Sequence, residues 1–225
     1  MRKSSAAAFA AIMLTACNQT PSPEHAAATQ NTARAATPGP CATDFVGVTQ
    51  ATPACGIALG GDGSLTAGER HYPPVIASYR QDATGQVGIP AKKLILFPPA
   101  SQSGLRIIRA CEDTDANSIC WAVSLLNPTT GILQNVVAGK YGPEQWLAWS
   151  PQERRVALIS RNEGAEWLYI VNAATGTTAT YPDASENANW QIDRQSFAWT
   201  GDDSFSVKVK SCEACAFATR SFTLP

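Results

Sequence analysis

Histidine is scarce in this sequence, with two residues, His25 and His71, among 225. No Gly-x-Ser-x-Gly motif accompanies them, so the strained turn that carries a nucleophilic serine in one large class of hydrolases is missing. His71 precedes Tyr72-Pro73-Pro74, which fits the start of a surface strand better than a catalytic base. The sequence therefore predicts no catalytic residues, no cofactor and no enzyme.

Excess charge and long apolar runs are also missing. Seventeen lysines and arginines face 18 aspartates and glutamates, and no basic run suggests that the chain binds nucleic acid. The apolar run at 6–14 covers nine residues, too few for a helix to cross a bilayer. After the basic Met1-Arg2-Lys3, this run instead predicts a signal peptide over residues 1–16.

The end of this run, Leu14-Thr15-Ala16-Cys17, resembles the lipobox of bacterial lipoproteins. The resemblance implies cleavage before Cys17, whose thiol and new amino group carry acyl chains that insert into the bilayer. Several acyl chains anchor a protein far more firmly than one chain does. Asn18 is not the aspartate that retains many such lipoproteins at the inner membrane, so we expect a lipid-anchored envelope protein at the outer membrane.

The stretch after Cys17 has almost nothing to bury. Residues 18–40 contain no Val, Ile, Leu, Phe, Met, Trp or Tyr, a composition that predicts disorder. We expect residues 17–40 to be a tether with a root-mean-square reach of roughly 25–30 Å. Residues 41–225 are then one folded domain, long enough for a sizeable core.

Turn signals recur within this domain. Thr84-Gly85, Thr130-Gly131 and Thr175-Gly176 lie 46 and then 45 residues apart, and each follows a run of strand-forming residues. The best-defined copy is 147–176, with expected strands at 155–160 and 167–171 around a hairpin loop at 161–166. No useful helical periodicity follows residue 17. The sequence therefore predicts an all-β, antiparallel fold with a repeat of about 46 residues.

Segment 147–176 resembles a blade of the TolB-type and WD-repeat β-propellers: an aromatic residue with Ser-Pro, a turn, an apolar strand, a hairpin, an aromatic strand and a turn with glycine. The usual Asp-Gly of the first turn is replaced by Gln152-Glu153 and by Asp202-Asp203. The resemblance implies about four blades, the first assigned to 41–90 by dividing the length. A closed propeller, an open arc of three or four sheets and a twisted β-meander all fit the pattern.

Six cysteines follow Cys17, and an even number in an exported protein indicates disulfides. Two pairs flank the same loop of the repeat, which predicts bridges Cys111–Cys120 and Cys212–Cys215 and leaves Cys41–Cys55. Cys212-Glu213-Ala214-Cys215 also has the spacing of a redox motif, but its flanks are strand-like and not helical.

Two further groups are candidate sites. Asp113, Asp115 and Asn117 alternate as in a calcium loop, but Ser118 and Ser124 replace its glycine and glutamate. Weak calcium binding there stays open, and no metal site is predicted. Trp146 and Trp190 fall in polar connections and are candidate contact residues. Each could instead pack back onto its own sheet. The other four tryptophans (121, 149, 167 and 199) are expected inside strands.

These features predict a membrane-anchored module that binds an unidentified envelope protein non-covalently, as an assembly factor, inhibitor or immunity protein. Its contact surface is expected in the loops at 139–146 and 181–190 and in the hairpin tips at 112–119 and 213–214. Two alternatives are a hydrolase of cell-wall or other polysaccharides and a purely structural lipoprotein. The lipid bilayer, reached through Cys17, is the other expected partner.

Overall fold

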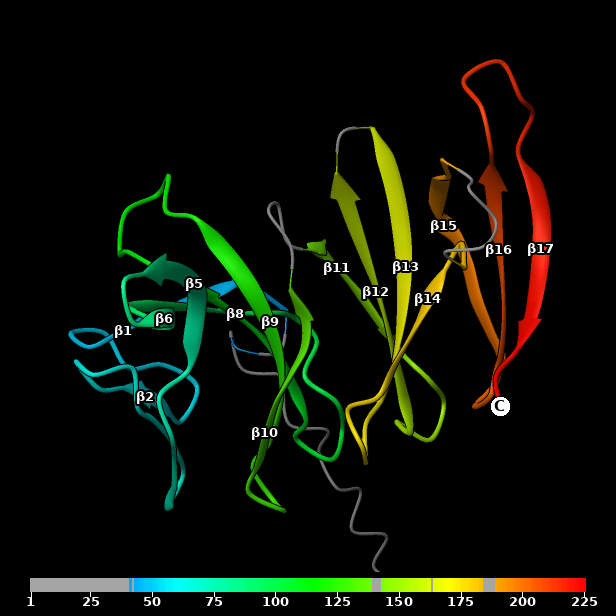
Figure 1. Cartoon of the computed structure of the whole chain (residues 1–225). Coiled ribbons are helices and arrows are strands. Elements are labelled where there is room, and N and C mark those ends of the chain that lie inside the picture. Colours follow the sequence, from blue (N-terminus) through cyan, green and yellow to red (C-terminus); the bar gives the residue numbers. More distant parts are fainter. Residues whose placement is uncertain (1–40, 42, 139–142, 163, 184–188) are drawn as a thin grey trace, which may run out of the picture. The chain divides into compact units, whose positions relative to one another are not determined.

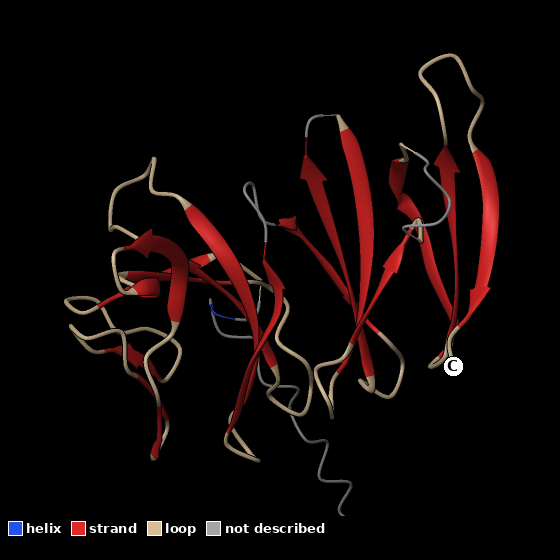
Figure 2. Ribbon diagram, viewed as in Figure 1, coloured by secondary structure: helices blue, strands red, loops and turns tan. Residues whose placement is uncertain are grey.

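The structure is a computed structural model that describes residues 41, 43–138, 143–162, 164–183 and 189–225. These residues form strands and no α-helix (Figures 1 and 2), so the prediction of an all-β fold is confirmed. None of them forms a helix long and apolar enough to cross a membrane. The strands are β1 (Val46–Thr49), β2 (Ile57–Leu59), β3 (Leu65–Ala67), β4 (Arg70–Tyr72), β5 (Ile76–Asp82), β6 (Gly85–Pro90), β7 (Lys93–Leu96), β8 (Arg106–Cys111), β9 (Cys120–Asn127), β10 (Ile132–Ala138), β11 (Pro143–Trp149), β12 (Arg155–Asn162), β13 (Ala165–Asn172), β14 (Thr178–Tyr181), β15 (Gln191–Gly201), β16 (Ser204–Lys210) and β17 (Ala218–Thr223).

The strands make five sheets with antiparallel pairing throughout. Their orders are β1-β7-β8-β9-β10, β11-β12-β13-β14, β15-β16-β17, β2-β3-β4 and β5-β6. From β7 onward, each strand pairs with the next one along the chain inside its sheet. The described residues form no closed propeller.

The sheet β1-β7-β8-β9-β10 is apolar on both faces, because neighbouring residues of a strand point to opposite sides. In β8, Ile108 belongs to a core shared with the small strands β2 to β5. Its neighbour Ile107 belongs to a second core, shared with β11, β12 and β13. Both side chains are fully buried. The doubly apolar run in β8 therefore packs the sheet against two layers.

A third core lies between the sheets β11–β14 and β15–β17. Ile159 and Leu168 meet Phe205, Val207 and Val209, all of them buried. The alternate residues of β16 and β17 point away from this core and are polar: Ser206 pairs with Ser221, and Lys208 with Thr219. The outer face of this sheet therefore suits contact with water.

The three Thr-Gly pairs lie at the turns from β5 to β6, from β9 to β10 and from β13 to β14. Gly85, Gly131 and Gly176 have φ values of 125°, 78° and 69°. A side chain at such positive φ is strained, which explains why glycine stands at each position. The prediction that each Thr-Gly pair lies where a strand turns back is confirmed.

Residues 41–90 differ from the expected first repeat. They form β1 to β6, which divide among three sheets, so they do not build one sheet of four strands. Their strands β2, β3 and β4 have three residues each, because glycine and proline interrupt the chain at Gly60-Gly61, Gly68 and Pro73-Pro74. The boundaries 41–90 came from dividing the domain length by the repeat length, which carries no information about where short strands begin and end.

The three predicted disulfides are all present: Cys41–Cys55, Cys111–Cys120 and Cys212–Cys215. Cys111 and Cys120 face each other across the pair β8–β9. Cys212 and Cys215 close the tip between β16 and β17. Both pairs sit where a hairpin holds the two flanking residues close together.

Candidate functional site: a charged turn surface

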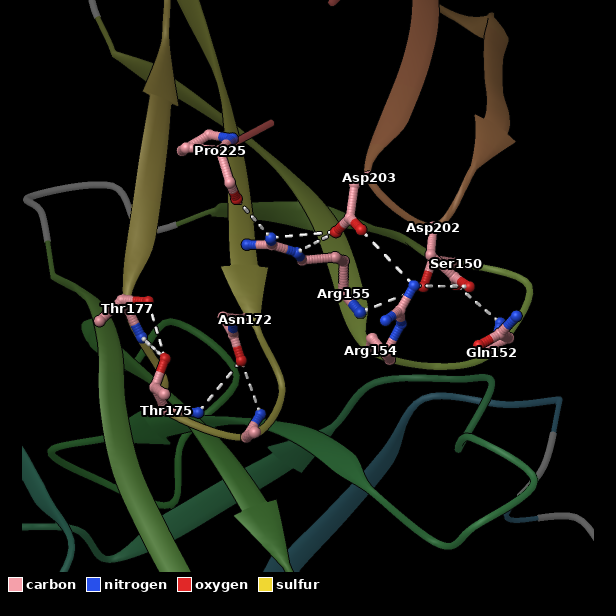
Figure 3. Close-up of polar contacts among 11 residues, drawn as sticks. Ser150, Gln152, Arg154, Arg155, Asn172, Thr175, Thr177, Asp202, Asp203 and Pro225 are labelled. Atoms are coloured by element: carbon pink, nitrogen blue, oxygen red, sulfur yellow. Dashed lines mark hydrogen bonds and ion pairs between the residues drawn. The ribbon is translucent and has the colours of Figure 1, made fainter. Parts of the chain in front are cut away.

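Charged and polar side chains meet where three turns end neighbouring strands. We define the turn surface as residues 150–155, between β11 and β12, residues 172–177, between β13 and β14, and Asp202 and Asp203, between β15 and β16 (Figure 3). A cavity of about 410 Å³ opens there, lined by Leu105, Asn127, Glu153, Arg154, Arg155, Asn172, Ala173, Ala174 and Asp203. This size falls in the range of small-ligand sites and of pockets that receive a partner's side chain.

The first turn is fixed by its own hydrogen bonds. Ser150 is buried, and its Oγ accepts a hydrogen bond from the backbone N–H of Arg155 over 3.1 Å. The N–H of Glu153 donates to the carbonyl oxygen of Ser150 over 2.9 Å. Glu153 has a positive φ of 57°, which a side-chain-bearing residue seldom adopts. Such a conformation persists when its surroundings over-determine it.

The Glu153 carboxylate supplies these surroundings by binding the preceding sheet. Its Oε2 accepts hydrogen bonds from the N–H and the Oγ–H of Ser103 over 2.9 and 2.7 Å, and its Oε1 accepts one from the N–H of Gln102. Burial raises the pKa of this carboxyl, but the hydrogen bonds together outweigh burial and hold the pKa below its usual value. Glu153 therefore stays ionised and links the turn to the loop between β7 and β8.

Asp202 repeats this arrangement one sheet further along the chain. Its carboxylate is buried, and its Oδ1 accepts a hydrogen bond from the N–H of Gln152 over 2.8 Å. Burial raises the pKa of Asp202, whereas bonds from Gln152 and Ser150 and the positive charge of Arg154 lower it below the usual value. In two successive turns, an acidic side chain thus accepts a backbone N–H of the turn before it.

Two arginines complete the charged part of the surface. Arg155, with 16% of its side chain exposed, donates through Nε and Nη2 to Asp203 Oδ1 over 3.1 and 3.0 Å. Its Nη2 also donates to the carbonyl oxygen of Pro225 over 3.0 Å. Arg154 lies 3.4 Å from Asp202 and 3.5 Å from Asp203, and 59% of its side chain is exposed. Figure 3 shows Arg155 between Asp203 and Pro225.

The third turn is held by Asn172. Its Oδ1 accepts hydrogen bonds from the N–H groups of Ala174 and Thr175 over 2.9 and 3.2 Å. The Thr175 and Thr177 hydroxyls lie 2.8 Å apart (Figure 3). Asn127 makes the same pair of bonds, to Thr129 and Thr130, in the turn between β9 and β10. Side chains that bond their own backbone in this way fix a turn without a tertiary contact.

This arrangement suits recognition of a polar partner. The carboxylates of Glu153 and Asp202 are used within the protein, whereas Arg154 and Asp203, with 59% and 45% of their side chains exposed, keep donors and acceptors towards solvent. Within the described ranges, no group of three or more His, Cys, Asp or Glu side chains lies together as a metal site would require. Charges held in place lose little freedom when a partner binds them.

The two tryptophans expected on the surface lie elsewhere. Trp190 is 0% exposed and belongs to the third core. The Arg220 guanidinium lies over its ring, 5.1 Å from the ring centroid. The prediction that it is an exposed contact residue is wrong. Trp146 is half-buried in β11, with its ring 5.2 Å from that of Phe197. Both side chains therefore pack in or against the third core, Trp146 by contact with the neighbouring sheet, and the other four tryptophans lie within β9, β11, β13 and β15 as expected.

The other candidates are dispersed. His71 is exposed in β4, where its Nδ1 lies 3.2 Å from Thr66 Oγ1. Asp113, Asp115 and Asn117 lie in the exposed loop between β8 and β9. The Lys93 ammonium donates to the carbonyl oxygens of Thr114 and Asp115 in that loop over 3.4 and 3.0 Å. The Lys93 ammonium thus places a positive charge beside the loop that carries the three candidate ligands.

Several features predicted from the sequence lie outside the described residues. These are the signal peptide at 1–16, Cys17 and the tether to residue 40, together with 139–142 and 184–188 of the two predicted contact loops. The tip with Cys212 and Cys215 is described and exposed.

The turn surface was not predicted from the sequence, although one signal was present. Gln152-Glu153 and Asp202-Asp203 stand where the pattern of the β-propeller blades would place Asp-Gly. Each pair contains an acidic residue whose carboxylate accepts a backbone N–H from an earlier turn or loop. Arg154 and Arg155, which follow Glu153, do not depart from any pattern in the sequence that would indicate a role.

Comparisons with known proteins add no relatives: the chain matches no known family, and no curated protein matches it in sequence.

Proposed function

We propose that this chain is a lipid-anchored module of the bacterial envelope that binds another envelope protein non-covalently through the turn surface. The observation that carries the proposal is the set of hydrogen bonds by which Glu153 and Asp202 fix neighbouring turns while Arg154 and Asp203 stay exposed. Exposed charges held at fixed positions give specificity and fast association.

We further propose that three of the sheets are propeller-like repeats: β7–β10, β11–β14 and β15–β17. Similar contacts between successive sheets support this. Trp149 Nε1 donates to the carbonyl oxygen of Pro99 over 3.0 Å, and Trp199 Nε1 donates to that of Ala148 over 3.2 Å. Glu153 and Asp202 each accept a backbone N–H from the turn or loop of the sheet before. Asn127 and Asn172 each accept backbone N–H groups within their own turns. Repetition places similar turns side by side, which creates an extended surface.

The envelope location is proposed from the N-terminal sequence. Leu14-Thr15-Ala16-Cys17 supplies the lipid anchor, and residues 18–40 supply the tether. Three disulfides in the domain support an oxidising compartment such as the periplasm. An anchored domain on a flexible tether can sample partners within reach of the membrane. The outer membrane is the proposed site, with an assembly, inhibitor or immunity role.

The test is a crosslinking pull-down from intact cells, with a variant that blocks the turn surface. Ala174 is exposed and lines the cavity, and its side chain contributes none of the hydrogen bonds described above. Ala174→Arg places a bulky charge there, so we expect it to lose the partner at least about tenfold, which corresponds to 1.4 kcal/mol. The full chain is compared with a version that contains only the lipidated tether.

The matched control is Ala116→Arg, an equally exposed alanine in the hairpin tip at 112–119. We expect this variant to keep the partner. Capture that survives Ala174→Arg but fails with Ala116→Arg would reject the turn surface. Hydrolysis of peptidoglycan or polysaccharide by the purified protein would instead favour the alternative that the chain is an enzyme. Absence of any specifically captured protein would favour a structural lipoprotein.

A further inference from the structure

A second cavity lies where the sheet β2-β3-β4 meets the sheet that contains β8 and β9. Its volume is about 610 Å³, and it shares no lining residue with the turn-surface cavity. Gly56, Gly68, Glu69 and Arg70 line it from the smaller sheet and its turns, and Arg106 begins β8 on the other side. We call it the Arg106 cavity.

Each arginine of this cavity is held by one backbone carbonyl group. Arg106 Nη1 donates to the oxygen of Cys41 over 3.1 Å, and Arg70 Nη2 donates to that of Thr129 over 2.6 Å. A guanidinium has five N–H donors, so each keeps further donors after its single bond. Cys41 is fixed by its disulfide to Cys55, itself a lining residue. The Arg106 side chain is therefore positioned by a covalently restrained segment.

These arginines differ from the arginines of the turn surface in their partners. Arg154 and Arg155 each lie within 4 Å of an aspartate. No ion pair of Arg70 or Arg106 with a carboxylate occurs among residues 41, 43–138, 143–162, 164–183 and 189–225. Arg106 is also half-buried, and this burial lowers the pKa of its guanidinium. A desolvated cation whose partner is a neutral carbonyl gains from an added anion.

The charges of the lining select the kind of anion. Two guanidinium groups and the exposed carboxylate of Glu69 give the cavity a net charge of one positive unit. A monoanion balances that charge, whereas a doubly charged phosphate exceeds it and is repelled more strongly by Glu69. Ile57, Ala67, Leu126 and Pro128 make the remaining walls largely apolar. Cavities of this size with a few polar groups suit small organic ligands.

We propose that the Arg106 cavity binds a small organic molecule with a single carboxylate and a short apolar part. Arg106 and Arg70 donate to the carboxylate, for which the planar guanidinium is the best-matched side chain. The apolar part of the ligand lies against Leu126 and Pro128. Glu69 opposes binding of polyanions. This inference is independent of the partner proposed for the turn surface.

The test uses the full chain and ligand-observed saturation-transfer NMR with N-acetyl-leucine. N-acetyl-leucinamide has the same apolar part without the charge and is the matched probe. We expect the acid to bind at least about tenfold more tightly than the amide, because the neutral amide accepts hydrogen bonds from the guanidinium groups but forms no ion pair with them. Equal binding of the two probes, or no binding of the acid at about 20 mM, would overturn the proposal, since even weak sites bind near millimolar concentrations.

Three variants localise the effect. Arg106→Gln should weaken binding of the acid about tenfold, and Glu69→Gln should strengthen it about two- to fivefold by removing a like charge. Arg80→Gln, an exposed arginine of β5 outside the cavity, should change nothing. Glu69 is exposed, so its variant decides the matter even if Arg106→Gln fails to fold. Unchanged or weaker binding by Glu69→Gln, or loss of binding with Arg80→Gln, contradicts the proposal.

Discussion

The indole Nε1–H of Trp199 donates a hydrogen bond to the carbonyl oxygen of Ala148 over 3.2 Å. This bond joins β15 to β11 of the preceding sheet, and the Trp199 ring also packs edge-on against Phe197 and Phe205. Trp149, at the end of β11, donates to the carbonyl oxygen of Pro99 in the loop after β7, in a more exposed setting. Both indole groups therefore bond to a backbone carbonyl of the preceding part of the chain, with different burial.

The difference in burial predicts different costs for the same substitution. Trp199→Phe should lower the free energy of unfolding by about 1–3 kcal/mol, because a partly buried carbonyl loses its donor and the core loses ring volume. Trp149→Phe should cost about 0.5 kcal/mol, because water can replace the indole N–H. Urea unfolding of both variants measures this. An equal or larger loss in Trp149→Phe would show that burial does not set the cost.

The sequence predicted what is local in this fold. The glycines of the three Thr-Gly turns need positive φ, and cysteines that flank one hairpin are brought together by that hairpin alone. Trp190 is a candidate contact residue from its sequence because polar residues precede it, but it is buried. Its alternation with Ile192, which shares its buried face, was the available signal.

The candidate site was harder to predict, because its contacts join different sheets. Glu153 and Ser103 are separated by 50 residues, and Asp202 and Gln152 by the same number. No local pattern tells which turns will meet, since that depends on how whole sheets pack. The replaced Asp-Gly pairs indicated where an acidic residue stands, but not what it binds.

Glu166 provides a second stability prediction. It is 2% exposed, and its Oε2 accepts the N–H of Ile192 over 2.5 Å while its Oε1 lies 2.7 Å from Arg161 Nη2. Glu166→Ala should lower the free energy of unfolding by about 2–3 kcal/mol, because a buried N–H loses a charged acceptor.

Glu166→Gln keeps an acceptor oxygen for Ile192 and should therefore cost less than the alanine variant. Denaturant titration at neutral pH compares the two. If both variants lose the same amount, the charge interaction with Arg161 and Arg194, which lies 3.8 Å away, dominates over the backbone bond.

Acid should weaken the links between the turns. The pKa values of Glu153 and Asp202 lie below their usual values of 4.5 and 3.8, so the folded state favours the ionised carboxylates. Their stabilisation is present above the unfolded-state values and is lost as the pH falls through the lower folded-state values. We expect the free energy of unfolding to fall below about pH 4.5 as both carboxylates become protonated.

The variant Glu153→Gln should have a flatter dependence on pH across this window, measured by urea unfolding between neutral and acidic buffers. Glu213→Gln, at the exposed tip between β16 and β17, is the matched control and should follow the original protein. Parallel curves for all three proteins would mean that Glu153 does not contribute to acid sensitivity.

Lipidation is tested at Cys17. Cys17→Ser removes the thiol that accepts the lipid in the proposed lipobox, so we expect the protein to leave the membrane fraction and to lose label from palmitate fed to the cells. Asn18→Asp is the companion variant and should move the anchored protein towards the inner membrane. Label retained on the serine variant would contradict a lipid anchor at this position.

The three disulfides should differ in their ease of reduction. Reduction requires a thiolate to reach a disulfide sulfur, so access decides which bridge opens first. Cys212, Cys215 and the residues around them, 211–217, are exposed, whereas Cys111 is 0% exposed. Mild dithiothreitol followed by alkylation and peptide mapping should therefore modify Cys212 and Cys215 before Cys111 and Cys120.

Opening the exposed bridge should also cost the least stability. It spans a sequence separation of 3, against 9 for Cys111–Cys120 and 14 for Cys41–Cys55. In the loop-entropy picture the shortest loop contributes about 2 kcal/mol and the others about 3 kcal/mol. The double variant Cys212→Ser/Cys215→Ser should thus unfold at a higher urea concentration than Cys111→Ser/Cys120→Ser, whose sulfurs also leave a space in the core. The reverse order of urea stability would mean that the tip stabilises the β16–β17 pair more than its exposure implies. Earlier alkylation of Cys111 would mean that exposure does not decide which bridge is reduced first.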